Sequence, residues 1–151
     1  MYIDESGINE YLFREKGWAL RGGQIIGVVP GKKFARINMI AGRCDKEIYA
    51  FDIYKHNTNT TSFNAWLEHK LLPAVGPDKL IVMDNASFHK NIKTKEIIEK
   101  AKCTLLYLPP YSPDLNPIEN FWGWLKGKVR SLNGLFTLLE HVLKSMIAEW
   151  N

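Results

Sequence analysis

The segment from Pro109 to Pro117 constrains the fold more than any other part of the chain, because it holds four of the seven prolines in nine residues. Each proline fixes its own φ angle and restricts the residue before it, so this segment predicts a stiff, non-helical connection. A helix is expected where it ends, since Asn116 is a suitable N-cap and Pro117 suits the first helical position.

Two short apolar runs indicate buried parallel strands. Residues 80–83 form a continuous apolar run between Pro77-Asp78 and Asp84-Asn85, and residues 104–108 form a second run just before the proline-rich segment. A mostly polar stretch with helical spacing of isoleucines lies between them. The order strand, helix, strand predicts a parallel pair that is buried on both faces.

The rest of the chain adds an antiparallel part to this sheet. Apolar residues that alternate with polar ones predict strands, and apolar residues three and four positions apart predict amphipathic helices. The expected elements are a strand over 1–6, an irregular glycine-rich stretch over 8–33, a hairpin of strands 34–43 and 47–54, a helix over 63–71 that ends near Pro73, a helix over 116–132 and a final helix over 135–150. The sequence therefore predicts a single α/β domain with a mixed sheet.

Composition excludes several classes of protein. A chain of 151 residues buries enough surface to fold as one domain without a metal or a disulfide. Cys44 and Cys103 form no metal-binding pattern, which suits a reducing cytoplasm. No stretch approaches the roughly 20 apolar residues of a membrane span. The net charge of +4 favours a polyanionic partner only weakly.

Three carboxylates stand at positions that suit a site, and each also has a structural explanation. Asp84 directly follows a buried strand, where α/β sheets commonly bind ligands, but Asp84-Asn85 also suits a turn. Asp4 follows the apolar pair of the first strand, and Ser6-Gly7 is expected to end that strand. Glu119 occupies the third helical position if Asn116 is the cap, where a capping box accounts for it fully.

If these three carboxylates converge, they form an oxygen-only site suited to Mg²⁺ or Mn²⁺. Two such ions about 4 Å apart activate a water or a 3′-hydroxyl and stabilise the leaving oxygen during in-line attack on phosphorus. This chemistry needs neither a Cys/His cluster nor a phosphate-binding glycine loop, and the sequence has neither.

Taken together, the motifs resemble the DDE transposases of the mariner superfamily, in particular the bacterial insertion-sequence branch. Between Asp84 and Glu119 lie 34 residues, a spacing typical of that branch. The resemblance covers roughly residues 1–132. It is carried by Ile3–Gly7, by Gly17-Trp18 with Arg21-Gly22, by Val82–Asn85 with His89-Lys90, and by the long signature Leu108–Glu119.

The resemblance implies a ribonuclease H-like fold whose mixed five-stranded sheet, with the first strand central, is flanked by helices. Asp4, Asp84 and Glu119 would be the catalytic ligands of two Mg²⁺ or Mn²⁺ ions. Family members hydrolyse double-stranded DNA at transposon ends and join the freed 3′-hydroxyl to target DNA, usually as a homodimer on DNA. A cytoplasmic, nucleoid-associated bacterial protein is therefore expected.

One departure from the family concerns the N-terminus. Full-length relatives carry helix-turn-helix segments before the first aspartate, whereas three residues precede Asp4 here. Residues 1–151 are thus expected to be the catalytic domain alone: an excised domain, a second reading frame or a decayed copy. The alternative function is a catalytically silent remnant that binds DNA or a full-length transposase and modulates it. A junction-resolving or ribonuclease H enzyme fits the proline-rich signature less well.

Further residues are candidates for contacts around this site. Lys90, Lys126 and Arg130 are candidate phosphate-backbone contacts, although a solvated helix face explains each of them singly. Trp18 and Arg21 are candidates for a DNA or intersubunit contact.

Asn85, His89 and Asn116 are candidate hydrogen-bonding groups around the ligands, with turn and cap roles as alternatives. The tryptophans at 66, 122 and 124 are expected in the core or on a partner surface.

Overall fold

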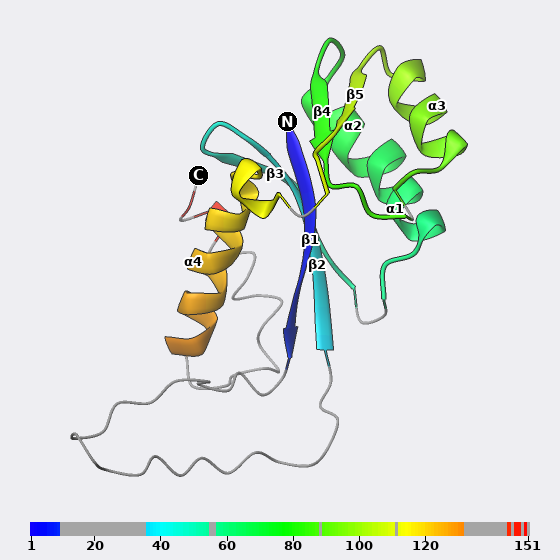
Figure 1. The fold of residues 1–151 in the computed structure, drawn as a ribbon. Helices are drawn as coiled ribbons and strands as arrows, with labels where there is room; N and C mark the ends of the chain where they lie inside the picture. The colour runs from blue at the N-terminus through cyan, green and yellow to red at the C-terminus, as the bar shows by residue number, and fades with distance from the viewer. Residues whose placement is uncertain are drawn as a thin grey trace, which may run out of the picture.

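The computed structural model describes residues 1–9, 36–54, 57–87, 89–110 and 112–131, together with Ser145, Ile147, Ala148 and Trp150. Figure 1 shows one sheet with helices on both sides. Its five strands lie in the order β3-β2-β1-β4-β5. They are β1 (Tyr2–Asn9), β2 (Arg36–Cys44), β3 (Glu47–Tyr54), β4 (Leu80–Met83) and β5 (Thr104–Tyr107).

The sheet is part antiparallel and part parallel, as the sequence predicted. β1 is antiparallel to β2, and β2 is antiparallel to β3. β1 is parallel to β4, and β4 is parallel to β5. The expectation that both strands of the parallel pair are buried on both faces is wrong for β5, which is an edge strand with Leu106 48% exposed, and for Leu80 at the start of β4, which is also 48% exposed. The tight turn between β2 and β3 places Asp45 at φ 52°, a left-handed conformation that aspartate tolerates better than most residues. The prediction of a mixed five-stranded sheet with the first strand at its centre is confirmed.

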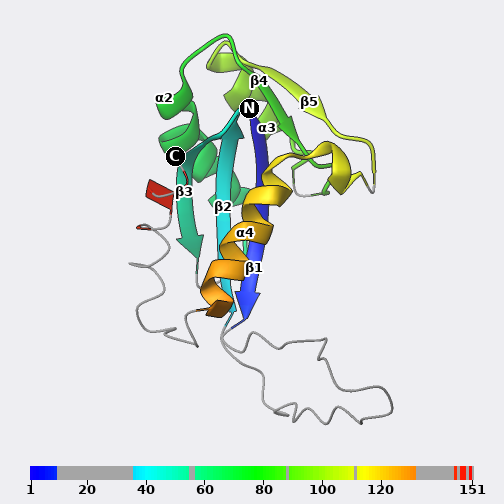
Figure 2. The same cartoon turned by 90° about the vertical axis from the view of Figure 1, so that its left-hand side faces the viewer.

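Helices cover the two faces of the sheet unequally. The segments α1 (Thr60–Trp66), η1 (Leu67–Leu71), α2 (Leu72–Val75) and α3 (Ile92–Lys100) lie on one face, and α4 (Ile118–Ser131) crosses the other in front of β1 and β2 (Figure 2). Each face has its own apolar core. Ile3 packs with Phe63 and Trp66 on the α1 side, whereas Ile8 packs with Trp122 and Leu125 on the α4 side.

The first strand is longer than predicted. β1 continues through Gly7 and Ile8, which pair with Asn38 and Ile37 of β2, so Ser6-Gly7 does not end it. Ile8 is fully buried under α4, and this burial extends the strand beyond the glycine. The expectation of irregular structure from residue 8 is wrong for the two residues 8 and 9. As a result, Asp4 lies within β1 and not at its end.

The helix that was expected to end near Pro73 continues to Val75. The turns Leu67–Leu71 are π-helical, and the N–H of Leu72 donates to the carbonyl of Leu67. This wider turn places Pro73 in the first turn of α2, where a missing backbone N–H costs little. Apolar spacing could not reveal the change of helical register.

The proline-rich segment also differs in detail from the prediction. It contains one turn of 3-10 helix, η2 (Pro113–Leu115), and α4 starts at Ile118, one residue after the expected position. The expected final helix and the glycine-rich stretch lie largely outside the described residues. None of the helices in the described ranges combines the length and apolar character needed to cross a bilayer.

Candidate active site

Two of the three candidate carboxylates come from adjacent parallel strands. Tyr2 of β1 pairs with Val82 of β4. Asp4 and Asp84 each follow two residues later, so they stand at the same level of the sheet. Asp84 lies directly beyond the carboxyl end of β4, as predicted.

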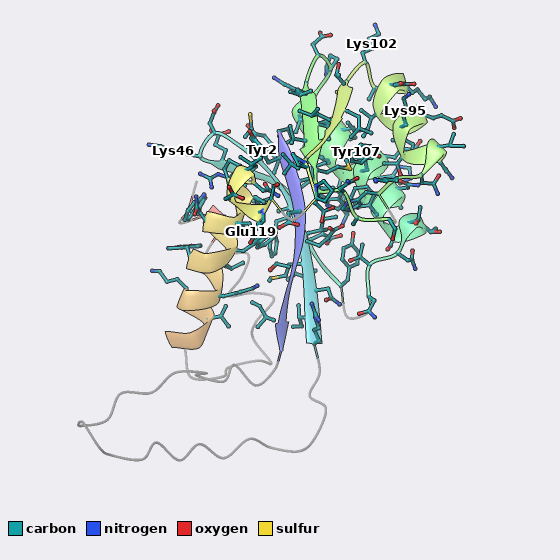
Figure 3. The ribbon with its side chains drawn as sticks, in the orientation of Figure 1. Tyr2, Lys46, Lys95, Lys102, Tyr107 and Glu119 are labelled. Atoms are coloured by element: carbon teal, nitrogen blue, oxygen red, sulfur yellow. The ribbon has the colours of Figure 1, made fainter. Side chains whose placement is uncertain are left out.

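Helix α4 brings the third carboxylate to the same place. Glu119 is the second residue of α4 and lies at the end of the helix that is nearest the centre of the sheet (Figure 3). Three residues later, the indole Nε1 of Trp122 donates to Oδ2 of Asp4 at 3.0 Å. Trp122 is 1% exposed, and this bond connects the second turn of α4 to β1.

All three carboxylates line one open cleft of about 470 Å³. The proline-rich segment forms one wall of it, and the turn after β4 forms another. Its lining residues are Asp4, Asp84, Asn85, Ala86, Leu108, Pro109, Pro110, Ser112, Pro113, Asn116 and Glu119. The structure therefore brings the three predicted ligands together with Asn85 and Asn116 in one cleft, and His89 contacts Asp84 without lining the cleft.

The surroundings of Asp4 disfavour the ionised form of its carboxyl group. Burial is the largest cause, followed by the charge of Glu119, and together with Glu5 and Asp84 they raise the pKa of Asp4 to about 7. A cleft in which clustered carboxylates disfavour the ionised form of one member is a site that a cation would stabilise.

Asp84 has the opposite environment. Its Oδ1 accepts a hydrogen bond from Nδ1 of His89 at 2.6 Å and another from the amide of Ala86 at 3.1 Å. The bond from His89 is the main cause that lowers the pKa of Asp84, against the effect of burial. Asp84 is thus held ionised, whereas Asp4, with a pKa of about 7, is only about half ionised at neutral pH.

Asn116 does not act as the predicted cap. The amide of Glu119 donates to the backbone carbonyl of Asn116 at 3.1 Å, and the side-chain Oδ1 of Asn116 accepts no hydrogen bond within the described residues. The capping box that offered a complete structural explanation for Glu119 is therefore not formed. Asn116 is 5% exposed, so its Oδ1 is a buried acceptor beside the cleft that lacks a donor among the described residues.

The donor set of this cleft fits Mg²⁺ or Mn²⁺. It offers carboxylate oxygens and the amides of Asn85 and Asn116, and no described lining residue brings sulfur or imidazole; oxygen donors of this kind are the ligands that hard divalent cations prefer. Within the ranges that the structure describes, no three His, Cys, Asp or Glu side chains stand close enough together to form a preassembled metal cluster. Asp4 and Asp84 would form the core of a metal site, with the exposed Glu119 at its rim.

The candidate DNA contacts are placed only in part. Lys90 is exposed next to His89 and does not line the cleft. Lys126 lines a separate cavity of about 270 Å³ together with Glu5, Ser6 and Arg36, further along α4 than Glu119. Trp18, Arg21 and the side chain of Arg130 lie outside the described residues.

Three contacts around the site were not foreseen from the sequence. They are the bond from Trp122 to Asp4, the contact between His89 and Glu5, and the bond from the hydroxyl of Tyr107 to the carbonyl of His89. Trp122 was expected in the core or on a partner surface, and its burial places it in the core. The position of Glu5 beside Asp4 was the one available signal for the second contact.

Comparison with known proteins identifies relatives that share part of this chain. A curated protein of Sinorhizobium fredii (strain NBRC 101917 / NGR234), the uncharacterized protein y4pE/y4sA, is 33% identical over 76 residues, which is 50% of this chain and 53% of that protein. The transposable element Tc3 transposase of Caenorhabditis elegans is 36% identical over 67 residues, which is 44% of this chain and 20% of that protein. The matched regions thus span about half or less of these relatives.

Solved structures share the fold. The Mos1 transposase paired-end complex with left transposon end has a TM-score of 0.70 at 17% identity, over 85% of this chain and 41% of that one. A pre-cleavage Mos1 transpososome has a TM-score of 0.72 at 14% identity, over 97% of this chain and 47% of that one. These matches confirm the predicted ribonuclease H-like fold.

Paired-end complexes of the same mariner transposase have been solved with Mn and with Mg. A family model described as DDE superfamily endonuclease matches residues 1–141, which is most of the chain. The sequence motifs, the sheet topology and the shared cleft agree with that match, and the chain belongs to the DDE superfamily endonucleases.

Proposed function

We propose that this chain is a metal-dependent transposase catalytic domain that cleaves DNA strands and transfers the freed 3′ end to target DNA. The observation that carries the proposal is the convergence of Asp4, Asp84 and Glu119 on one cleft in a chain of the DDE family. The identity of these residues as catalytic ligands is part of the proposal.

In this proposal Asp4 and Asp84 hold divalent cations between adjacent strands, and Glu119 completes the ligand set from α4. When bound, two Mg²⁺ or Mn²⁺ ions supply a deprotonated water or 3′-hydroxyl as nucleophile and neutralise charge on the leaving oxygen. The cleft is open to solvent, so a DNA backbone can reach these carboxylates.

The residues of the protein prepare this site for phosphodiester chemistry. Trp122 fixes Oδ2 of Asp4, and His89 with Ala86 fixes Oδ1 of Asp84, so one oxygen of each aspartate is oriented before substrate binds. The unpartnered Oδ1 of Asn116 is suited to accept a hydrogen bond from a water or hydroxyl in the cleft. Asn85 lines the same cleft and is a second candidate for such a contact.

Double-stranded DNA is the proposed partner, in a homodimeric complex. The supporting observations are the net charge of +4, the exposed Lys90 beside His89 and the partly buried Lys126 on α4, to which Arg130 adds a third cation on the same helix as Lys126. The relatives described as transposases and the solved complexes with transposon ends are consistent with this partner. End recognition by Trp18 and Arg21, the bacterial branch and a nucleoid location stay predictions.

A strand-cleavage assay tests the proposal. Labelled double-stranded DNA is incubated with Mn²⁺ and either the wild-type protein or the Asp84→Ala variant. We expect metal-dependent nicks with wild type and none with Asp84→Ala. An absence of cleavage by folded wild type, with DNA binding that is equal in both proteins, would refute intrinsic catalysis and favour the silent remnant.

A further inference from the structure

A buried histidine connects Asp84 to a carboxylate that has no role in the proposed reaction. The imidazole of His89 is fully buried. Its Nδ1 lies 2.6 Å from Oδ1 of Asp84, and its Nε2 lies 3.2 Å from Oε1 of Glu5. His89 therefore bridges Asp84 and Glu5, with one ring nitrogen at each carboxylate.

The surroundings of His89 hold the ring in one orientation. Its ring centroid lies 4.4 Å from that of Phe63, which is itself fully buried. The backbone of His89 is fixed at both ends, because its N–H donates to Ala86 and its carbonyl accepts from the Tyr107 hydroxyl at 2.9 Å. Because the ring is held in this orientation, its Nδ1 stays directed at Asp84 while its Nε2 contacts Glu5.

Glu5 reaches this ring from the face of β1 opposite to Asp4. Its side chain is 16% exposed, whereas that of Asp84 is 50% exposed. Side chains alternate along the strand, so Asp4 lies on the α4 face together with Ile8, and Glu5 lies on the α1 face together with Ile3. Asp4 therefore lines the cleft, whereas Glu5 contacts His89.

The hydrogen bonds to Asp84 leave one of its two oxygens for a ligand. Oδ1 already accepts from Nδ1 of His89 at 2.6 Å and from the amide of Ala86 at 3.1 Å. Oδ2 of Asp84 accepts no hydrogen bond within the described part of the chain, so it is the oxygen left for that ligand.

We propose that Glu5 and His89 are positioning residues that hold Asp84 with Oδ1 bound to protein and Oδ2 presented to a divalent cation. The inference rests on the proposed function, because it takes Asp84 as a metal ligand. Such partners of metal ligands typically contribute 10- to 100-fold to metal affinity.

Binding of Mn²⁺ alone, measured by isothermal titration calorimetry without DNA, tests this role. The variants are Glu5→Gln, which keeps the shape of the side chain, Glu5→Asp, which keeps its charge, and His89→Gln. Asp84→Ala reports the ligand itself. Thr94→Val is the matched control, because it removes a buried hydrogen bond of 2.7 Å to Asn64 that does not touch the cleft.

We expect Glu5→Gln and His89→Gln to weaken Mn²⁺ binding by about 10- to 100-fold. Asp84→Ala should abolish binding, and Glu5→Asp should recover part of the loss caused by Glu5→Gln. Thr94→Val should lower the urea midpoint without changing the affinity. Circular dichroism checks that each variant is folded, and His89→Gln carries the test if Glu5→Gln is not.

Two results would overturn the inference in different ways. Wild-type affinity in folded Glu5→Gln and His89→Gln, with binding lost in Asp84→Ala, would refute the positioning role and leave the proposed function intact. Equal binding by wild type and Asp84→Ala would refute Asp84 as a ligand, and both the proposed function and this inference would fall.

Discussion

Metal binding should release a proton from Asp4 at mildly acidic pH. Burial, the charge of Glu119 and the neighbouring acids raise the pKa of Asp4 to about 7 in the metal-free protein. A carboxylate must be ionised to serve as a ligand, so a cation has to displace this proton. With a pKa of about 7, roughly nine in ten molecules carry the proton at pH 6 and about one in ten at pH 8.

The size of the effect follows from this protonation equilibrium. The apparent dissociation constant for Mn²⁺ should be about tenfold weaker at pH 6 than at pH 8, and it should weaken by a further factor of about ten between pH 6 and pH 5. The titration of His89 contributes little to this pH dependence below pH 7. Burial by itself would lower its pKa, but the bonds to Asp84 and Glu5 raise it to about 9, so the ring stays protonated.

Calorimetric titration with Mn²⁺ in two buffers of different ionisation enthalpy counts the protons released. We expect about 0.9 proton per protein at pH 6 and about 0.1 at pH 8. Asp114→Asn is the matched control, because Asp114 is an exposed acid of the proline-rich segment that does not line the cleft, and it should leave the count unchanged. An equal proton count at both pH values, or an affinity independent of pH between 5 and 7, would refute this reasoning.

Three further predictions concern stability. Trp122→Phe keeps an aromatic ring in the α4 core but removes the donor to Asp4, so urea denaturation at pH 8 should show a loss of about 1–3 kcal/mol, and an unchanged midpoint would contradict the role of this bond. Leu125→Ala leaves a cavity under α4 and should cost about 2–5 kcal/mol in the same assay, whereas a loss below 1 kcal/mol would mean that this core is not tightly packed. Because the folded protein raises the pKa of His89 from 6.5 to about 9, its contribution is fully present below pH 6.5 and is lost as pH rises through 9. The free energy of unfolding should therefore fall more steeply over pH 6.5–9 in wild type than in His89→Gln, and parallel curves would refute this.

Much of the fold could be predicted because local patterns coincide with the tertiary environment. Three residues of the run Leu80–Met83 are buried, namely Ile81, Val82 and Met83, and the hairpin turn at Asp45-Lys46 is polar since it is exposed. The length of β1 could not be predicted, because Ile8 follows a glycine and joins the strand only through burial under α4. The continuation of the helix through Pro73 likewise depends on a π-helical turn that leaves no trace in apolar spacing.

In the candidate site, too, some features could be predicted from the sequence and others could not. Asp84 and Glu119 stand at positions that sequence motifs and chain direction fix, namely the end of a strand and the start of a helix after a stiff connection. The contacts of Glu5 with His89 and of Trp122 with Asp4 join residues 84 and 118 positions apart, and no local pattern encodes them. Asn116 stands at a suitable sequence position for a cap, yet its Oδ1 lies beside the cleft and accepts no hydrogen bond from the described residues, which only the packing reveals.

Anomalous diffraction from crystals of the protein grown with Mn²⁺ would test the central claim most directly. The account predicts anomalous peaks in the cleft, with the first ion bound by Asp4 and by Oδ2 of Asp84 and with Glu119 turned inward as a further ligand. Mn²⁺ bound only outside this cleft, with the three carboxylates free of metal, would contradict it.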